Sequence, residues 1–337
     1  MSKNILKRFL TNTGPKPNFT KKFINKYKIL DNIIIKNFGE KNPSKIFYVI
    51  KRTPGAGMFS NLTFVLNHLK VAKKFDFIPI VDMQNYPSIY NESKKINGSK
   101  NSWEYYFKKL SNYSLSEVYK SKNVLITDDY FEKNMSLDIT QISGFKKLKK
   151  NIQFNKNLIN EFKVLYKKLF KNEKNILGIH FRGTTYKTAR GHAFPLSKKL
   201  MIENINYLIN KFKYKKIFLV TEEDKYLEYF KKVYKEKLIY CNFYRSKKQD
   251  AFKIYPRKLH RYKLGKEIIL ETLLLSKCKG LTFVKSNVSS ASLFFSKKKI
   301  KTHPLFIGYN SRNKFVARWL WYIKKLLPKN LGGLKLN

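Results

Sequence analysis

Short apolar runs alternate with longer amphipathic stretches along most of the chain, and these patterns predict strands and helices respectively. In the first half, apolar runs at 45–51 and 77–83 enclose an amphipathic helix, which we expect to be capped by Ser60 or Asn61. Two strands joined through a helix should be parallel. A further strand at 124–127 and a helix at 154–170 are expected before the midpoint.

The alternation is more regular in the second half. Strands are expected at 176–181, 216–221, 238–241 and 281–285, and helices at 197–212, 224–234 and within 265–280. Strands that alternate with helices indicate a parallel sheet. We expect a basic loop over 245–263. The tail at 315–327 is predicted to be a helix packed on a domain, with a position on a membrane surface as the alternative.

These patterns predict an α/β protein with two Rossmann-like domains facing a cleft. A length of 337 residues suits two domains of ordinary size. We expect a basic, irregular N-terminal arm over 1–44, with room for one short helix. The first domain is then expected over 45–172 and the second over 173–337. The boundary is placed in the charged connection at 171–175.

The net charge of +49 does not by itself indicate a nucleic-acid site. Only nine of the 71 basic residues are arginine, and Asn, Ile, Phe and Tyr are also abundant, as AT-rich codon usage would produce. The lysines are spread in pairs over most predicted helices, so most should be solvated. Their field still attracts anionic nucleotides, lipids or nucleic acids.

The two cysteines, Cys241 and Cys278, have the spacing of neither a disulfide framework nor a metal site, and they suit a reducing compartment. No stretch has the length and apolarity of a membrane span, and the N-terminus lacks a secretory segment. We therefore expect a cytoplasmic protein, with peripheral contact at an anionic inner membrane face as a further expectation. The sequence shows no recognised nucleic-acid motif, so no specific nucleic acid is expected.

Two strand ends carry residues suited to an anionic ligand. The strand at 176–181 delivers His180 and Arg182 to its carboxyl end, where ligands bind in open α/β sheets. An arginine is a planar fork of donors that suits phosphate oxygens. The turn Ser286–Ser290 joins a strand to a helix and offers amides and hydroxyls to an anion. The alternatives are a surface arginine with a core histidine, and a plain helix cap.

Two further segments are weaker signals. The turn Gly55-Ala56-Gly57 lets the backbone approach a ligand, but it lacks the third glycine of a dinucleotide fingerprint and the Gly-Lys-Ser/Thr of a P-loop, and a plain tight turn is the alternative. The acids of Val220–Asp224 follow a strand end, where they also suit a helix dipole. The chain has neither Asp-x-Asp after a strand nor paired histidine ligands, so no metal is expected.

In this order, the four segments resemble the superfamily of α1,2-, α1,6- and protein O-fucosyltransferases over about residues 46–295. The resemblance rests on PGAGMFSN, HFRGTTYK, VTEED and ILETLLLSKCKGLTFVKSNVSSAS. They look like the glycine turn ending in Asn, the His-x-Arg-x-x-Asp motif, the acidic strand end and the final helix with its serine-rich turn. The resemblance implies an inverting, metal-independent enzyme with a GT-B-like fold.

The resemblance also implies roles for single residues. Arg182 is expected to hold the β-phosphate of GDP-fucose and to stabilise the leaving GDP. His180 and Glu271 are expected near the guanine. The first domain would serve the acceptor and the second the donor, with no cofactor beyond the GDP-sugar. The other expected donor contacts are Gly57, Asn61, Glu222, Ser286, Asn287, Val288 and Ser289.

Two residues depart from the family pattern: Thr185 replaces an acid, and Glu271 stands where Asp is commoner. His192 is our candidate for the base that activates the acceptor hydroxyl, because its ordinary pKa suits that task. Glu222 and Glu92 are the reserves.

The expected acceptor is a glycan, such as a surface polysaccharide, a lipopolysaccharide core or a lipid-linked oligosaccharide. A transferase using another GDP-sugar is the nearest alternative. A non-enzymatic basic protein that binds nucleic acid or an anionic membrane is the more distant one.

Overall fold

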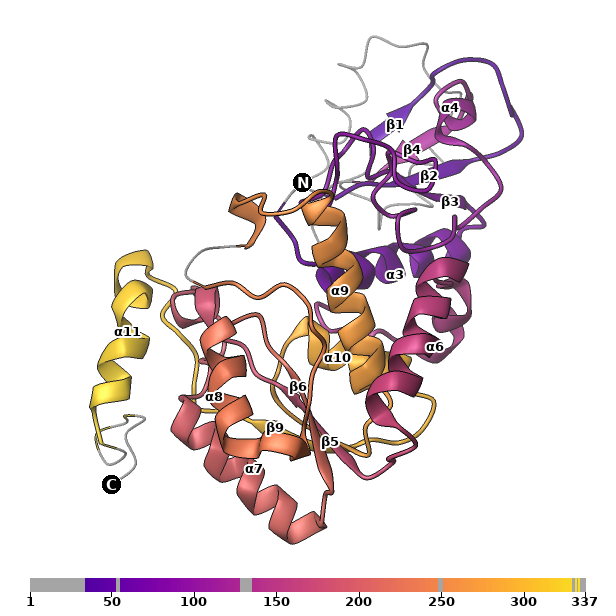
Figure 1. The fold of residues 1–337 in the computed structure, drawn as a ribbon. Helices are drawn as coiled ribbons and strands as arrows, with labels where there is room; N and C mark the ends of the chain where they lie inside the picture. The colour runs from indigo at the N-terminus through magenta and orange to yellow at the C-terminus, as the bar shows by residue number, and fades with distance from the viewer. Residues whose placement is uncertain are drawn as a thin grey trace. The chain divides into compact units, whose positions relative to one another are not determined.

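The computed structural model describes residues 34–52, 55–127, 135–247, 251–328, 331 and 333. The chain divides into two compact units, Met1–Lys156 and Asn157–Asn337, each built on a mainly parallel sheet (Figure 1). The division places helix α6 (Lys156–Phe170) with the second unit, ahead of the connection in which we expected the boundary. Most of the expected N-terminal arm, residues 1–33, lies outside the described residues.

The first unit contains a four-stranded sheet in the order β1-β4-β2-β3. Strand β2 is parallel to both β3 and β4, which confirms the predicted strand–helix–strand unit. Strand β1 runs antiparallel to β4, so the end of the arm is a strand and not irregular as expected. The elements are β1 (Ile34–Lys36), β2 (Phe47–Ile50), α3 (Met58–Lys74), β3 (Ile78–Val81), α4 (Leu115–Val118), β4 (Val124–Ile126) and α5 (Phe145–Leu148).

Helix α3 begins earlier than the sequence predicted. Gly57 occupies the N-cap without a side-chain hydrogen bond, and Met58 and Phe59 in the first turn are buried. The predicted cap at Ser60 or Asn61 is therefore wrong, because burial of two large apolar side chains extends the helix toward the turn. Tyr48 of β2 ties the sheet to α3, since its hydroxyl lies 2.8 Å from His68 Nδ1.

The second unit contains a five-stranded, fully parallel sheet in the order β7-β6-β5-β8-β9. Numbered along the unit, this order is 3-2-1-4-5, which matches the first five strands of the 3-2-1-4-5-6 order of a Rossmann sheet. The strands are β5 (Ile176–His180), β6 (Lys216–Val220), β7 (Leu238–Ile239), β8 (Gly280–Val284) and β9 (Lys301–Leu305). The helices after α6 are α7 (Lys198–Phe212), α8 (Asp224–Tyr234), α9 (His260–Leu275), α10 (Asn287–Phe295) and α11 (Lys314–Leu326).

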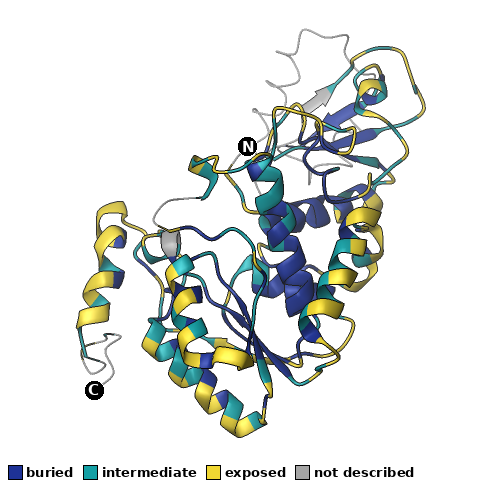
Figure 2. Cartoon of the chain, viewed as in Figure 1, coloured by how far each residue is buried: buried dark blue, intermediate teal, exposed yellow. Residues whose placement is uncertain are grey.

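Helices cover both faces of this sheet, and the side chains of its central strands alternate between two cores. Leu177 and Ile179 of β5 join the core formed with α7 and α8. Ile176 joins the opposite core, formed with α6, α9 and α10. Gly178 lies on that second side, where a Cβ atom would stand 2.9 Å from Leu275 Cδ2. Figure 2 shows the buried interior of the unit between these helices.

Two features of the second unit differ from the predictions. Strand β9 was not predicted, because KTHPL has no strand-like apolar run. Helix α9 begins at His260, inside the segment that we expected to be a loop up to Lys263.

Candidate functional site

The predicted strand ends of the second unit meet at the centre of its sheet. Strands β5 and β8 are neighbours there, and the chain leaves them toward opposite edges, which makes this the topological switch point where α/β proteins bind ligands. His180 ends β5 and Ser286 follows β8. His180 Nδ1 lies 3.1 Å from Ser286 Oγ, in a hydrogen bond whose donor depends on the histidine tautomer. Two predicted site segments thus come into direct contact.

Burial keeps His180 neutral. Its side chain is almost fully enclosed, and burial, followed by the nearby charge of Arg182, lowers its pKa to about 3. A neutral imidazole has one donor and one acceptor nitrogen. The contact with Ser286 therefore positions the turn after β8 without adding a charge to the site.

Arg182 lies just beyond β5 and is held from two sides. Its Cζ atom lies 3.3 Å from the centre of the Tyr186 ring, and its Nε lies 3.8 Å from Glu222 Oε1. About a quarter of the arginine side chain remains exposed (26%), so the guanidinium is oriented and still open to a ligand. An arginine stacked on a ring loses less conformational freedom when it binds phosphate.

The acidic segment after β6 fixes the loop that carries Arg182. The Gly183 N–H donates to Glu222 Oε1 over 3.1 Å. A Cβ atom at Gly183 would stand 2.0 Å from Glu223 Oε2, so any larger residue here would force the Glu223 side chain to move. Lys187 Nζ donates to both oxygens of Glu223, at 2.9 and 3.1 Å. The side chain of Thr185, the departure from the family pattern, is not among those described, and Glu222 and Glu223 supply carboxylates to this loop.

The start of α10 is a well-formed helix N-terminus. Ser286 is the N-cap and exchanges hydrogen bonds with Ser289 in a capping box. Both serine hydroxyls are therefore engaged within the protein. The first N–H groups of a helix, here those of Asn287 and Val288, have no carbonyl partner inside it and carry the positive end of its dipole. These amides are the groups suited to an anion.

We call the group formed by His180, Arg182, Gly183, Glu222 and the N-terminus of α10 the switch-point cluster. It combines the guanidinium of Arg182, the first amides of α10 and the neutral imidazole of His180 at the carboxyl ends of β5 and β8. Each segment was singled out from the sequence, and the resemblance to fucosyltransferases implied that they form one donor site.

His192 lies in the loop beside this cluster. Its ring centre is 5.0 Å from that of Tyr186, the ring on which Arg182 stacks. Partial burial, and then the charge of Arg182, lower the pKa of His192 below its ordinary value of 6.5. The Asn310 N–H donates to the His192 carbonyl over 2.8 Å, which fixes the backbone of the loop. The histidine is therefore neutral near pH 7 and able to accept a proton.

Glu271 is engaged elsewhere. It lies on α9, where its Oε1 is 2.5 Å from Arg245 Nη2, and each side chain is only 5% exposed. Burial raises the pKa of Glu271 to about 7 against the opposing charge of Arg245. The structure therefore places Glu271 in a buried ion pair and not at an open surface. Sequence reasoning missed Arg245, although the scarcity of arginine in this chain marks it as a residue to examine.

The first unit holds the remaining predicted residues. Gly57 caps α3, while Asn61 is 4% exposed within the first turns of that helix, so its side chain is enclosed. Glu92 lies in the aromatic loop region after β3. There, Trp103 and Tyr106 are buried. These rings therefore pack in the interior of the first unit.

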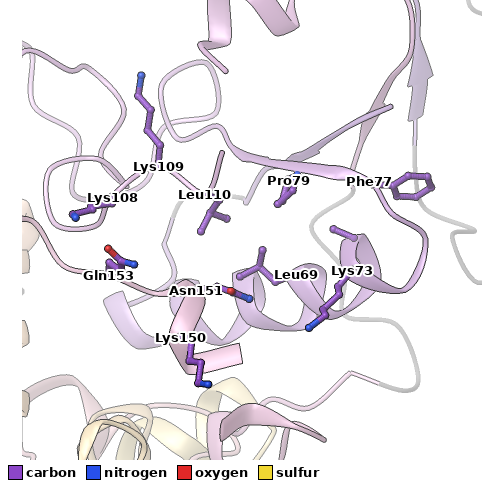
Figure 3. A pocket seen from close by; sticks show the side chains of 11 residues that line it. Leu69, Lys73, Phe77, Pro79, Lys108, Lys109, Leu110, Lys150, Asn151 and Gln153 are labelled. Atoms are coloured by element: carbon purple, nitrogen blue, oxygen red, sulfur yellow. The ribbon is translucent and has the colours of Figure 1, made fainter. Parts of the chain in front are cut away.

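A cavity of about 430 Å³ opens in the first unit (Figure 3). It lies beside the C-terminal half of α3 and the start of β3. Its walls combine apolar side chains with the lysines 73, 108, 109 and 150. None of the predicted site residues lines it. This cavity could not be predicted from the sequence, because its lysines come from three separate segments.

Among the described residues, no group of three or more His, Cys, Asp and Glu side chains is placed to hold a metal ion. In the same part of the chain, no helix combines the length and apolarity that crossing a membrane requires.

No family model and no curated protein sequence matches the chain. Among solved structures it is similar to the fucosyltransferase NodZ from Bradyrhizobium, with a TM-score of 0.48 and 13% identity, covering 74% of this chain and 92% of that one. It is also similar to POFUT1 in complex with GDP, with a TM-score of 0.42 and 11% identity, covering 76% and 98%. A mutant of Arabidopsis thaliana FUT1 in complex with GDP gives a TM-score of 0.44 and 10% identity, covering 90% and 77%.

Proposed function

We propose that this protein is a glycosyltransferase that binds a GDP-sugar, first of all GDP-fucose, at the switch-point cluster and transfers the sugar to a hydroxyl group of a glycan. One observation carries the proposal. The oriented guanidinium of Arg182 and the N-terminus of α10 stand at the ends of adjacent strands, joined by the contact of His180 with Ser286. That edge suits a pyrophosphate, because its charges are matched there by a fork of donors and by helix amides.

Arg182 has the central role in this proposal. As the bond to the sugar breaks, negative charge accumulates on the pyrophosphate of the leaving GDP. Donors that are oriented in advance stabilise this charge without reorganisation, and such stabilisation is commonly the largest catalytic effect. Tyr186 and Glu222 provide the advance orientation of Arg182. Arg182 and the amides of Asn287 and Val288 would supply the positive charge, so the proposed reaction needs no metal.

We assign the base role to His192. In a single displacement at the anomeric carbon, with inversion, the acceptor hydroxyl must lose a proton. His192 and Arg182 both contact the ring of Tyr186. The lowered pKa of His192 keeps its imidazole unprotonated, so it can accept that proton. Glu222 is the reserve, although its carboxylate already accepts from Gly183 and faces Arg182.

The proposal also covers the acceptor and the sugar that is transferred. A surface polysaccharide, a lipopolysaccharide core or a lipid-linked oligosaccharide would present the hydroxyl to a cytoplasmic enzyme. Gly57 and Asn61 of the first unit remain proposed donor contacts. A different GDP-sugar would use the same pyrophosphate contacts and is therefore the alternative donor.

Thermal unfolding with GDP, GDP-fucose, GDP-mannose, UDP and UDP-glucose, in the presence of EDTA, tests this function. A ligand at 100 times its Kd stabilises the native state by about 2.7 kcal/mol, which corresponds to a rise of roughly 5–10 °C for a domain of this size. GDP and GDP-fucose should produce this rise and the UDP compounds should not. Stabilisation only by heparin or DNA, lost with added salt, would instead indicate a general polyanion binder.

Variants of Arg182 make the test specific. Arg182→Ala should remove the response to GDP, and Arg182→Lys should restore only part of it, since lysine lacks the planar fork. Arg312→Ala, at an exposed arginine, is the matched control and should respond like the wild type. A full GDP response in Arg182→Ala would refute the assignment of the pyrophosphate site.

A further inference from the structure

The outer face of α11 is apolar and open to solvent. Phe315, Trp319, Tyr322 and Leu326 follow one another at the spacing of a single helix face. Their side chains are 81%, 58%, 45% and 75% exposed. Val316 and Ile323 widen the same face, and both are also about half exposed. Surface helices of soluble proteins normally turn such a face inward, so this one is arranged to meet another apolar medium.

The helix is firmly attached by its other side. Ala317 and Trp321 are buried, and the Trp321 Nε1–H donates to the Pro195 carbonyl over 2.8 Å. Trp321 also packs with Phe194 in a small apolar core. The Asn313 side chain caps the helix by accepting from the first amides. In Figure 2 the described part of α11 is exposed over most of its length, with its buried positions on one side. The exposed face is therefore a fixed surface of the fold and not a frayed end.

The positive charge of α11 indicates which kind of partner its apolar face binds. Lys314, Arg318, Lys324 and Lys325 are all basic, and the sequence contains no Asp or Glu after Glu271. A second copy of the chain would bring two sets of positive charges together. An anionic lipid surface matches both properties, because its headgroups attract the basic side chains while its acyl boundary accepts the aromatic and aliphatic ones.

We propose that α11 lies in the surface of an anionic membrane, with the face formed by Phe315, Val316, Trp319, Tyr322, Ile323 and Leu326 inserted below the headgroups. This proposal does not depend on which nucleotide the switch-point cluster binds. It adds a location to the proposed function, because a transferase held on the bilayer meets acceptors that are themselves attached to lipid.

The inner side of α11 links this surface to the candidate site. Asn310 Nδ2 donates both to the Ala317 carbonyl of the helix, over 3.0 Å, and to the Lys187 carbonyl of the site loop, over 3.3 Å. Lys187 Nζ also lies 5.3 Å from the centre of the Trp321 ring. Lys187 is the residue that pairs with Glu223. The loop bearing Arg182 is thus bonded to the helix that would rest on the membrane.

Tryptophan fluorescence offers a direct test, because the exposed and buried tryptophans differ clearly. Trp103 and Trp321 are 3% and 4% exposed, whereas Trp319 is 58% exposed. Vesicles of phosphatidylcholine and phosphatidylglycerol in a 3:1 ratio should bind the full chain, shift its emission to the blue and allow quenching by brominated lipid. Vesicles of phosphatidylcholine alone should bind far more weakly. Trp319→Phe should still bind the anionic vesicles but lose the shift.

Charge placed on the face should abolish insertion. The double variant Trp319→Glu, Leu326→Glu should lose at least about tenfold in vesicle affinity, equivalent to about 1.4 kcal/mol. Val164→Glu places one such charge at an exposed apolar position of α6, 65% exposed, and should bind like the wild type, whereas Trp319→Glu alone should already weaken binding. Thermal stabilisation by GDP, measured on the same proteins, reports the donor site separately.

Three results would overturn the proposal. Anionic vesicles that bind without shifting Trp319 emission, or that bind the double variant as well as the wild type, would show a contact made by lysines elsewhere. Self-association in sedimentation experiments that disappears in the double variant, without vesicle binding by the wild type, would show that the face joins two copies of the chain.

Discussion

The buried pair of Arg245 and Glu271 allows a sharp test of what Glu271 does. The resemblance to fucosyltransferases implies that Glu271 contacts the guanine, whereas in the structure its carboxylate is paired with Arg245 and both side chains are 5% exposed. Glu271→Gln keeps the shape of the side chain and removes its charge. The guanidinium of Arg245 would then be a buried cation that has lost its paired carboxylate, although Nη1 still donates to the Tyr244 carbonyl and Nη2 to the Cys241 carbonyl.

The expected loss of stability is large. Removing one partner of a buried ion pair typically costs about 3–5 kcal/mol, because the remaining charge stays desolvated. The retained carbonyl hydrogen bonds and the amide oxygen of Gln reduce this cost. We therefore expect the free energy of unfolding to fall by about 3 kcal/mol, which corresponds to a fall in Tm of roughly 6–12 °C for a unit of this size. Glu228→Gln is the matched control. It breaks an exposed pair with Lys231, whose Nζ lies 2.7 Å from Glu228, and exposed pairs contribute at most about 1 kcal/mol.

Thermal unfolding of the full chain, followed by circular dichroism at pH 7.5, measures these effects. The double variant Arg245→Met, Glu271→Leu should recover most of the lost stability, since apolar residues of similar volume replace such pairs well. Binding of GDP by this stable double variant then separates the two roles. Retained binding would leave Glu271 a structural residue, and loss of binding would return it to the donor site. A Glu271→Gln protein as stable as the Glu228→Gln control would refute the ion-pair reasoning itself.

Three further predictions concern the switch-point cluster. Gly183→Ala should lower stability by about 1–3 kcal/mol in denaturant titrations and weaken GDP binding, because its Cβ atom would displace Glu223; wild-type behaviour would contradict this. Tyr186→Leu should reduce GDP affinity severalfold in calorimetry while Tyr186→Phe keeps it, since only a ring supports Arg182; equal affinities would discount the stacking. The pKa of His180 is about 3 in the folded chain and about 6.5 when unfolded, so stability present above pH 6.5 is lost as the pH falls toward 3. His180→Gln should therefore remove about 2 kcal/mol of the stability difference between pH 7 and pH 5, and an unchanged pH profile would count against this.

Long periodic segments of this chain could be predicted from sequence, and short edge elements could not. Helix α8 spans the residues predicted for it, because Tyr226, Leu227, Phe230 and Tyr234 mark one buried face. Strand β9 escaped prediction because it lies at the sheet edge, where Pro304 is tolerated and most side chains stay partly exposed. The early start of α3 also escaped, since burial of its first turn depends on tertiary packing.

The candidate site shows the same division. Residues adjacent to strand ends, such as Arg182 and Ser286, could be found because a strand followed by glycine or serine is visible locally. Their partners could not be found in the same way. His180 and Ser286 are far apart in sequence, and the pairing of Glu271 with Arg245 depends on the loop after β7 returning to α9. Local patterns therefore indicated candidate segments, while the fold decided which side chains of those segments are exposed and which are buried.

The unequal use of lysine and arginine indicates that the arginines occupy positions where the guanidinium group itself is needed. If codon usage supplies the lysines, a lysine at a given position carries little information, whereas each arginine was retained against that bias. In the described chain, Arg257 binds both oxygens of Glu267 at 2.6 Å, Arg245 pairs with the buried Glu271, and Arg182 stacks on Tyr186. All three positions use the planar fork or the flat face of the guanidinium, which an ammonium group cannot replace. Replacement by lysine at these positions should thus be costly, although lysine is the residue that this chain uses almost everywhere else.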